Sequence, residues 1–313
     1  MARRPAAGGP VDLSVQVGSV ALRNPVMTAS GTAGHGDELG GYFDLSSIGA
    51  VVVKSLGADP WAGNAAPRVH QTPAGMLNSV GLQGRGIDYW RTEELPALLA
   101  SGATVVASIW GRAVEDYARA AELLAGLPEQ VVAVEVNLSC PNLHHGSDLF
   151  AHDPEAVTEV LGVAAACGKP MWAKLSPNTE RLVEVAGAAQ AAGAEAVTLI
   201  NTVMGMAIDV ETRRPRLGAG RGGLSGPAIH PVAVRCVYDV HAAHPELPIV
   251  VVGGVAVPEH AVELMLAGAS AVQVGTATFA DPRNVARIAA GMESWCRRQG
   301  VRRVSELTGG AHG

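Results

Sequence analysis

The sequence predicts an α/β protein that forms a single (β/α)8 TIM barrel, and three observations support this. Short apolar runs rich in β-branched residues recur along the chain, segments of helical period separate most of them, and polar residues or glycines follow their ends. Runs that are apolar throughout indicate strands buried on both faces, and their alternation with helices indicates a parallel sheet. Eight such strands favour closure into a barrel.

The candidate elements follow one another in regular order. The eight candidate strands are residues 25–28, 50–53, 104–107, 131–136, 170–173, 196–200, 249–252 and 271–274. The candidate helices between them include residues 114–124, 154–166, 180–192, 230–244 and 258–266. Several helices open on Pro or Asp-Pro and several close on Gly, as helix ends favour. The competing fold, an open doubly wound sheet, would require a Gly-rich dinucleotide fingerprint after the first strand, and none is present.

Two additions to the barrel are also predicted. The stretch that begins at Val11, with strand-like residues 15–17 and 21–22, indicates an N-terminal β-hairpin that closes the bottom of the barrel. The connections 55–86 and 202–226 are longer than a barrel requires and both follow strands, so we expect a long loop insertion at the catalytic face. We expect residues 1–10 to be a disordered tail and residues 11–313 to form one catalytic domain.

Composition and charge narrow the class of protein. The 313 residues are 48% hydrophobic and 17% charged, which suits a large core and not a disordered or fibrous chain. A net charge of −6 without a cluster of basic residues argues against nucleic acid as a partner and favours a small molecule. Residues 1–10 hold no apolar stretch long enough for a signal peptide or a membrane span, so we expect a cytoplasmic protein that does not bind membranes.

The four cysteines are scattered along the chain without a C-x-x-C pair. They are Cys140, Cys167, Cys236 and Cys296. Neither a disulfide framework nor an iron-sulfur cluster is therefore expected in this chain. Three of them are typical of small buried apolar residues, but Cys140 lies on a turn between Ser139 and Pro141. A thiol in that setting is more typical of proton transfer or nucleophilic chemistry than of packing.

Polar residues and glycines follow the predicted strands at their carboxyl ends. These are Ser30-Gly31-Thr32, Lys54-Ser55, Ser108, Asn137 with Cys140, Lys174, Asn201-Thr202, Gly253-Gly254 and Gly275-Thr276. Each alone is compatible with a solvated side chain or an ordinary turn. Because the carboxyl ends of barrel strands meet at one mouth, where barrel enzymes hold their active sites, together they predict a site there.

The chemistry of these residues favours a flat, phosphorylated ligand. Gly253-Gly254 and Gly275-Thr276 follow the last two strands, where barrels commonly bind phosphate through backbone amides. Ser225-Gly226-Pro227 offers either a further amide or an ordinary helix N-cap. Lys54 and Lys174 could stabilise negative charge on an electron-accepting ring, or one of them could form a Schiff base. The side-chain amides of Asn78, Asn137, Asn142 and Asn201 suit ring carbonyl and N–H groups.

These residues belong to motifs through which the chain resembles the class 1 dihydroorotate dehydrogenases, from about Leu13 to the C-terminal helix. The motifs are NPVMTASGT, VVVKS, PRV, GMLNSVGLQ, VNLSCPN, AKLSPN, INTVMGM, GGLSGPAI, VGGV and GASAVQVGTA. The cysteine of VNLSCPN is similar to the soluble class 1 enzymes, whereas the membrane-associated class 2 enzymes use serine. The NSVGLQ, INTVMGMAIDVETRRPRL and GGLSGPA segments look more like the class 1B catalytic subunit than the fumarate-using class 1A homodimer.

The resemblance implies an FMN oxidoreductase that converts (S)-dihydroorotate to orotate in de novo pyrimidine (UMP) biosynthesis. It implies one FMN per chain across the barrel mouth, hydride transfer from substrate C6 to flavin N5, and removal of the C5 proton by Cys140. Electrons would pass to NAD through an iron-sulfur flavoprotein subunit that carries FAD and a 2Fe-2S cluster. The implied assembly is a heterotetramer with two copies of each chain around a homodimer core.

The resemblance also implies which residues contact the two ligands, and it implies no metal site. FMN would contact Thr32, Lys54, Ser55, Asn137, Lys174, Ile200, Gly226, Gly253, Gly254, Gly275 and Thr276. Orotate or dihydroorotate would contact Lys54, Asn78, Ser79, Val80, Gly81, Leu82, Asn137, Asn142, Asn201 and Thr202. Cys140 and Lys54 would be the catalytic residues.

Two departures and three alternatives accompany the resemblance. Ser108 stands where the family commonly places an Asn near the flavin, and the gate loop after SCPN carries His144-His145. Adjacent loop histidines are usually solvated, although a metal pair or a proton relay is conceivable. The alternatives are a dihydropyrimidine (uracil or thymine) dehydrogenase-like FMN subunit, a non-redox phosphate-binding barrel lyase such as a lysine aldolase, and a flavin-binding scaffold without turnover. A preference for a substrate carboxylate separates the first alternative from a dihydroorotate dehydrogenase.

Overall fold

Eight parallel strands form the central sheet of the computed structural model, which describes residues 9–139 and 149–313. They are β3 (Val26–Thr28), β4 (Val51–Val52), β7 (Val105–Ile109), β8 (Val131–Asn137), β9 (Met171–Lys174), β10 (Ala196–Leu199), β15 (Ile249–Val252) and β16 (Ala271–Val274). Their order is β3-β16-β15-β10-β9-β8-β7-β4, and a parallel bridge between Met27 and Ala50 joins the two outer strands. This closure confirms the predicted (β/α)8 barrel and all eight of its predicted strands.

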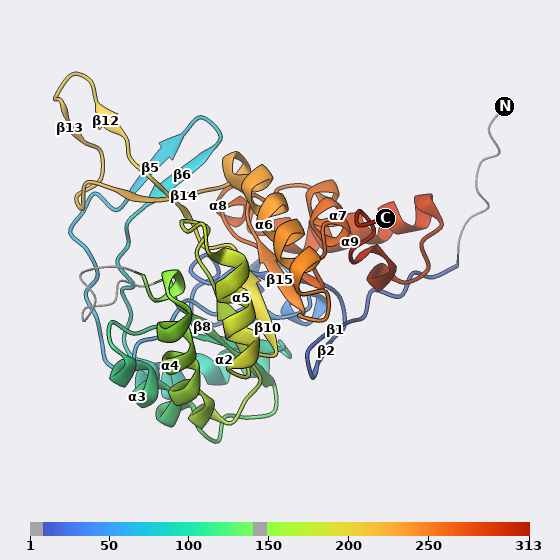
Figure 1. Ribbon diagram of the computed structural model, residues 1–313, viewed down its shortest axis with the longest axis horizontal. Helices are drawn as coiled ribbons and strands as arrows, with labels where there is room; N and C mark the ends of the chain where they lie inside the picture. The colour runs from blue at the N-terminus through green and yellow to red at the C-terminus, as the bar shows by residue number, and fades with distance from the viewer. Residues whose placement is uncertain (1–8, 140–148) are drawn as a thin grey trace.

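Helices surround the barrel on its outside (Figure 1). They are α1 (Ile87–Tyr89), η3 (Trp90–Glu94), α2 (Leu95–Ala100), α3 (Val114–Leu124), α4 (Pro154–Ala164), α5 (Leu182–Ala191), α6 (His230–Ala243), α7 (Pro258–Leu266), α8 (Ala277–Ala280) and α9 (Asn284–Gln299). The five predicted helices correspond to α3 through α7. The α4 helix begins as its sequence indicates, because the Asp153 side chain accepts a hydrogen bond from the Glu155 amide and Pro154 occupies the first turn.

The predicted N-terminal hairpin is present as β1 (Val15–Val17) and β2 (Val20–Leu22), which pair antiparallel. Its valines and its leucine are buried, while Gln16 and Ala21 between them are exposed. The turn of the hairpin is attached to the residue before β10, because the backbone N–H and hydroxyl of Ser19 both donate to the carboxylate of Glu195, at 2.7 and 2.6 Å. The hairpin therefore lies at the amino-terminal end of the barrel strands, as predicted.

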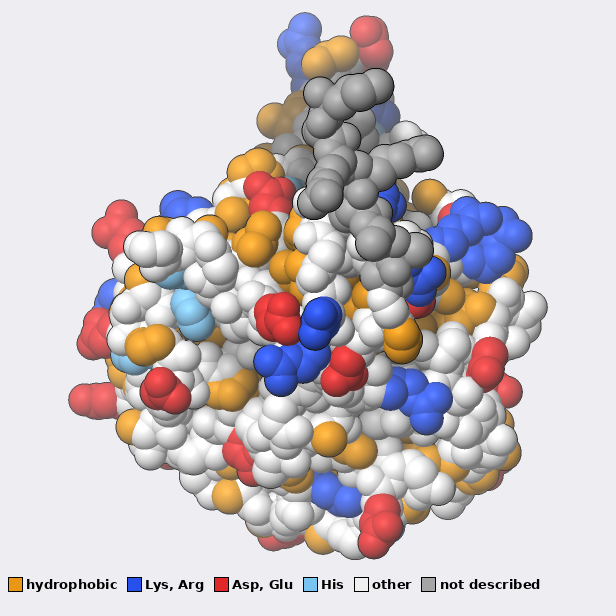
Figure 2. Space-filling view, turned by 90° about the vertical axis from the view of Figure 1, so that its right-hand side faces the viewer, with side chains coloured by type: hydrophobic (Ala, Val, Ile, Leu, Met, Phe, Trp, Pro, Cys, Tyr) orange, Lys and Arg blue, Asp and Glu red, His pale blue; other side chains and the backbone are white. Residues whose placement is uncertain are grey.

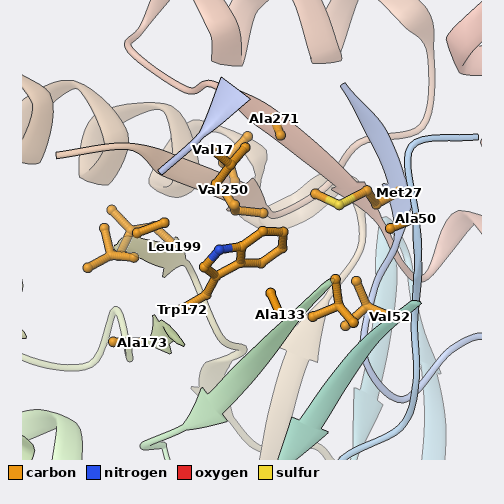
Figure 3. Close-up of a cluster of buried hydrophobic side chains, with 14 of the residues drawn as sticks. Val17, Met27, Ala50, Val52, Ala133, Trp172, Ala173, Leu199, Val250 and Ala271 are labelled. Carbon is orange, nitrogen blue, oxygen red and sulfur yellow. The ribbon is translucent and has the colours of Figure 1, made fainter. Parts of the chain in front are cut away.

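The interior of the barrel is filled by side chains. Figure 3 shows the Trp172 indole pointing into this interior, with Val52, Ala133 and Val250 among the residues around it, and all four are fully buried. A TIM barrel core of this kind is packed and leaves no channel through the sheet. Space for a ligand therefore remains only at a mouth of the barrel.

The two long connections pair with each other and form a second sheet over one end of the barrel (Figure 1). This sheet, here called the cap sheet, consists of β5 (Val69–Thr72), β6 (Gly75–Asn78), β11 (Val203–Gly205) and β14 (Gly222–Ser225), in the order β11-β14-β6-β5. A separate hairpin of β12 (Ile208–Asp209) and β13 (Arg214–Pro215) projects beyond it. The insertion was predicted as loops, and its ordered sheet is a finding of the structure.

The exterior gives further information on partners. The face that Figure 2 presents carries acidic and basic side chains interspersed, without a broad patch of one sign. Within the described residues, no helix combines the length and apolar character needed to cross a membrane.

Cys167, Cys236 and Cys296 are buried and free, as predicted for small apolar residues, whereas Cys140 lies outside the described residues.

Candidate active site

A cavity of about 530 Å³ lies between the carboxyl ends of the barrel strands and the cap sheet. Its volume falls in the range of about 300–1,000 Å³ that is usual for small-molecule sites. The structure brings all of the described sequence-predicted contact residues to its wall. These are Thr32, Lys54, Ser55, Asn78, Ser79, Val80, Gly81, Leu82, Asn137, Lys174, Ile200, Asn201, Thr202, Gly226, Gly253, Gly254, Gly275 and Thr276. The remaining candidates, Cys140 and Asn142, lie outside the described residues, as do His144 and His145.

Glycine turns after β15 and β16 form one side of the cavity. Gly254 has φ +71°, and a Cβ atom there would lie 2.7 Å from the Cβ of His230, so this turn requires glycine. Gly253 is equally crowded, since its Cβ would lie 2.5 Å from that of Ala233. These close approaches leave backbone, without side chains, on the cavity wall. A wall of this kind can approach a phosphate closely and offer it N–H groups.

Ser225 joins the cap sheet to the last strand turn. The hydroxyl of Thr276 donates to its Oγ at 2.7 Å, and Ser225 Oγ lies 3.5 Å from the carbonyl oxygen of Met76. The short helix that follows, Pro227–Ile229, receives no side-chain cap. Of the two roles that the sequence left open for this segment, the N-cap is therefore not the one that Ser225 performs.

A buried carboxylate lies beneath the cavity and was missed by the sequence analysis. Glu135 is fully buried on β8, and its carboxylate lies 3.3 Å from the ammonium nitrogen of Lys174. It accepts further hydrogen bonds from Gln273 Nε2 at 2.8 Å and from Ser108 Oγ at 3.3 Å. The available signal was an acidic residue within an otherwise apolar buried strand, because such residues are almost never fully buried unless they are paired.

Lys54 presents a different kind of cation to the same cavity. It follows β4, is half-buried, and makes no ion pair within residues 9–139 and 149–313. Burial lowers the pKa of Lys54, and the positive charge of Arg68 lowers it further. An ammonium group that lacks a carboxylate partner is suited to bind one from a ligand.

Hydrogen bonds link the side chains of Asn201, Asn137 and Ser55 across the cavity floor. Asn201 Nδ2 donates to Asn137 Oδ1 at 3.1 Å, and Asn137 Nδ2 donates to Ser55 Oγ at 3.4 Å. Asn201 Oδ1 accepts from the backbone N–H of Thr202 at 2.8 Å, and the backbone carbonyl of Asn137 accepts from the Tyr117 hydroxyl at 2.7 Å. These bonds fix the orientation of both amides, and a planar ligand would meet donors and acceptors already in place.

Ser108 marks a departure from the family pattern, and its position explains what the shorter side chain does. Ser108 is fully buried, lies 2.9 Å from Ser55 Oγ and does not line the cavity. Its bond to Glu135 links the cavity wall to the buried ion pair. The hydroxyl therefore supports Ser55 and Glu135 from behind.

Several cavity residues escaped the sequence analysis as site residues. They include Asn64, Met204, Arg221, Gly223 and Phe279. Most of them belong to the two insertions, which approach the barrel mouth only because the cap sheet forms. Gly223 illustrates this close packing, because a Cβ atom on it would lie 1.9 Å from Thr202 Oγ1. No local pattern in the sequence indicates that contact.

Comparison with known proteins gives a consistent result. A family model described as dihydroorotate dehydrogenase matches residues 12–295. The chain is 49% identical over 302 residues, 96% of its length and 98% of the relative's, to the dihydroorotate dehydrogenase B (NAD(+)), catalytic subunit, of Geotalea uraniireducens (strain Rf4). Proteins of the same name from Geotalea daltonii and Geobacter sulfurreducens are 50% and 48% identical over 299 residues, 95% of this chain and 97% of each relative. The likeness therefore extends over the hairpin, the barrel and the cap sheet.

Proposed function

This chain belongs to the dihydroorotate dehydrogenase family, and we propose that it is the catalytic subunit of a class 1B, NAD-linked enzyme. In this proposal residues 11–313 form a cytoplasmic catalytic domain that oxidises (S)-dihydroorotate to orotate in de novo pyrimidine biosynthesis. The near-complete coverage of relatives with that name supports the proposal. The single observation that carries it is Lys54, which is half-buried and has no ion-pair partner among the described residues, in a cavity that is otherwise rich in amides.

The family is flavin-dependent, and the cavity suits FMN. The glycine turns at Gly253-Gly254 and Gly275-Thr276, with Gly226 beside them, would hold the phosphate through backbone N–H groups. Thr32, Ser55, Asn137, Lys174 and Ile200 would hold the ring system. FMN, when bound, supplies the hydride acceptor that no side chain provides. Lys174 would hold positive charge beside the ring, with Glu135 fixing its position.

Lys54 would bind the carboxylate of dihydroorotate, and this contact separates the two redox alternatives. The pyrimidine bases uracil and thymine carry no carboxylate, so a site for them has no need of a desolvated, unpaired cation. The loop residues Asn78 to Leu82, together with Asn142, Asn201 and Thr202, would enclose the pyrimidine ring. Their amides match its carbonyl and N–H groups.

Cys140 would act as the base that removes the C5 proton of the substrate. It follows Ser139, which lines the cavity, and precedes the proline of the SCPN turn. A thiolate is required for this step, because the protonated thiol cannot accept a proton. The lysine aldolase alternative receives less support, since the side-chain nitrogen of Lys174 is engaged by the buried Glu135 carboxylate at 3.3 Å, whereas Schiff-base formation requires a free amine.

A partner subunit completes the proposed enzyme. The relatives are named catalytic subunits, which implies a separate chain in their complexes. We infer an iron-sulfur flavoprotein partner with FAD and a 2Fe-2S cluster, two copies of each chain, and a homodimer of this chain at the core. The chain alone would then be reduced by substrate but would react poorly with NAD.

Substrate preference tests this proposal. The purified FMN-loaded chain is assayed with dihydroorotate and with dihydrouracil, using ferricyanide as the electron acceptor, beside the Lys54→Met variant. We expect turnover of dihydroorotate alone, and its loss in the variant. Turnover of dihydrouracil at an equal or higher rate would favour the dihydropyrimidine alternative. NAD reduction that appears only when the partner subunit is added would support the NAD-linked assembly.

A further inference from the structure

A histidine that the proposed chemistry does not use lies directly behind the Gly253-Gly254 turn. His230 is the first residue of α6, and its side chain is only 9% exposed. Its Cβ lies 2.7 Å from the position that a Cβ on Gly254 would take, so the two residues are in direct contact. Gly253 and Gly254 line the cavity but His230 does not. Any effect of His230 on a ligand must therefore pass through the turn.

Two hydrogen-bond partners hold the His230 ring in place. Nδ1 of His230 lies 3.2 Å from the carbonyl oxygen of Gly253, and Nε2 lies 2.8 Å from the carboxylate of Glu263. The ring is therefore held at both of its nitrogens, between the Gly253 turn and α7.

A second histidine, His260, lies beside the next carbonyl of the same turn, and its Nδ1 is also within reach of the backbone N–H of Ala256, at 3.4 Å. The ring of His260 stacks on that of His230 with 4.3 Å between centroids, and its Nδ1 lies 3.2 Å from the carbonyl oxygen of Gly254. In a trans peptide the C=O and the following N–H point in opposite directions. With both carbonyls directed at the histidines, the N–H groups of Gly254 and Val255 are directed away from them, and both residues line the cavity.

We propose that His230 is a positioning residue that makes this site select a phosphorylated ligand over its unphosphorylated analogue. The inference rests on the proposed FMN site at the same turn. His230 fixes the Gly253 carbonyl, which orients the N–H groups for a phosphate. Glu263 holds the other ring nitrogen, so the ring keeps its contact with the turn.

Binding of FMN compared with riboflavin, which lacks the phosphate, tests the inference. The purified full chain is stripped of flavin and titrated with each ligand while flavin fluorescence is followed. We expect the wild type to prefer FMN. His230→Gln and Glu263→Gln are each expected to reduce that preference by about fivefold to tenfold, while riboflavin affinity stays within about twofold, because only the phosphate would contact the turn that the ring holds in place.

Glu259→Gln is the matched control. Glu259 is an exposed residue on the same helix, α7, and makes no ion pair within the described part of the chain, so its removal should leave the preference unchanged. Equal weakening of FMN and riboflavin in the two variants would indicate a purely structural role and would overturn the inference, as would an unaltered preference. If His230→Gln does not fold, Glu263→Gln decides. A wild-type chain that binds neither flavin would remove the proposed function, and this inference with it.

Discussion

The ammonium nitrogen of Lys174 lies 3.3 Å from Oε1 of Glu135, and this ion pair separates the apolar interior of the barrel from the cavity. Glu135 is opposite Trp172 in the parallel pairing of β8 and β9, and Lys174 follows two residues later on the same face of the sheet. Trp172 fills the barrel centre, so Glu135 and Lys174 are also directed inward. Glu135, which does not line the cavity, therefore positions the Lys174 side chain at the cavity wall.

Removal of the buried carboxylate should destabilise the protein strongly. Glu135→Gln leaves Lys174 as an uncompensated buried charge, which typically costs about 3–5 kcal/mol. Denaturant titration of the flavin-free chain measures the free energy of unfolding. The control is Asp239→Asn, which breaks an exposed pair with Arg235 (2.9 Å) and should cost less than about 1 kcal/mol. Equal costs for the two variants would contradict the account of Glu135.

Gly254 should be intolerant of a side chain, and Gly126 offers a matched comparison. Both have φ +71°, but a Cβ on Gly254 would meet His230 at 2.7 Å, whereas nothing lies within 4 Å of one on Gly126. Gly126→Ala should therefore cost only the backbone term, about 1–2 kcal/mol, and leave FMN binding intact. Gly254→Ala should also weaken FMN binding, measured by flavin fluorescence. FMN affinity that is equal in the two variants would argue against a phosphate at this turn.

Orotate binding should weaken at alkaline pH earlier than an ordinary lysine would allow. Burial, and then the charge of Arg68, lowers the pKa of Lys54 from its ordinary value of 10.5. As the pH rises through this lowered pKa, Lys54 loses its proton and its attraction for the orotate carboxylate. Spectral titration of the oxidised chain with orotate across this pH range measures the effect. Lys54→Met should bind weakly at every pH, and an affinity in the wild type that stays constant up to pH 10.5 would contradict the role of Lys54.

The sequence predicted the barrel well because its strands are buried on both faces, which leaves a strong and continuous apolar signal. Each of the eight runs corresponds to an observed strand, and the polar residues predicted at the strand ends line one cavity where the structure describes them. Boundaries were less accurate. The predicted helix 154–166 ends at Ala164, because the chain continues as the 3₁₀ turn Ala165–Cys167, which keeps similar local geometry.

The cap sheet and the residues beneath the site were beyond the reach of the sequence. Pairing of β6 with β14 joins Asn78 to Gly223 across 145 positions in the chain, and Gly223 lies too close to Thr202 to carry a side chain. The role of Glu135 could not be predicted, because its partner Lys174 comes from β9 and meets it only when β8 and β9 pair. His230 looked like an ordinary first residue of a helix, because its partners Gly253 and Glu263 come from later elements.

Reduction of the bound flavin should depend on the ionisation of Cys140. A general base contributes about 100- to 10,000-fold to rate, so Cys140→Ala should slow flavin reduction by that factor while FMN stays bound. In the wild type, the single-turnover rate should rise with pH through the ordinary thiol range near about 8.5. Stopped-flow reduction by dihydroorotate measures both effects.

Cys167→Ala serves as the control for Cys140. Burial raises the pKa of the Cys167 thiol, and Cys167 does not line the cavity, so its removal should leave the profile unchanged. A rate that does not vary between neutral and alkaline pH, or a Cys140→Ala variant reduced as fast as the wild type, would remove Cys140 from the mechanism.

Anaerobic mixing of the purified, FMN-loaded chain with L-dihydroorotate, followed by flavin absorbance, tests the central proposal most directly. This single half-reaction reports on cofactor, substrate and hydride transfer together, and it requires no partner subunit. Prompt loss of the oxidised flavin absorbance is the predicted result. A chain that binds FMN and stays yellow with dihydroorotate, or one that remains colourless after FMN is added, would contradict it.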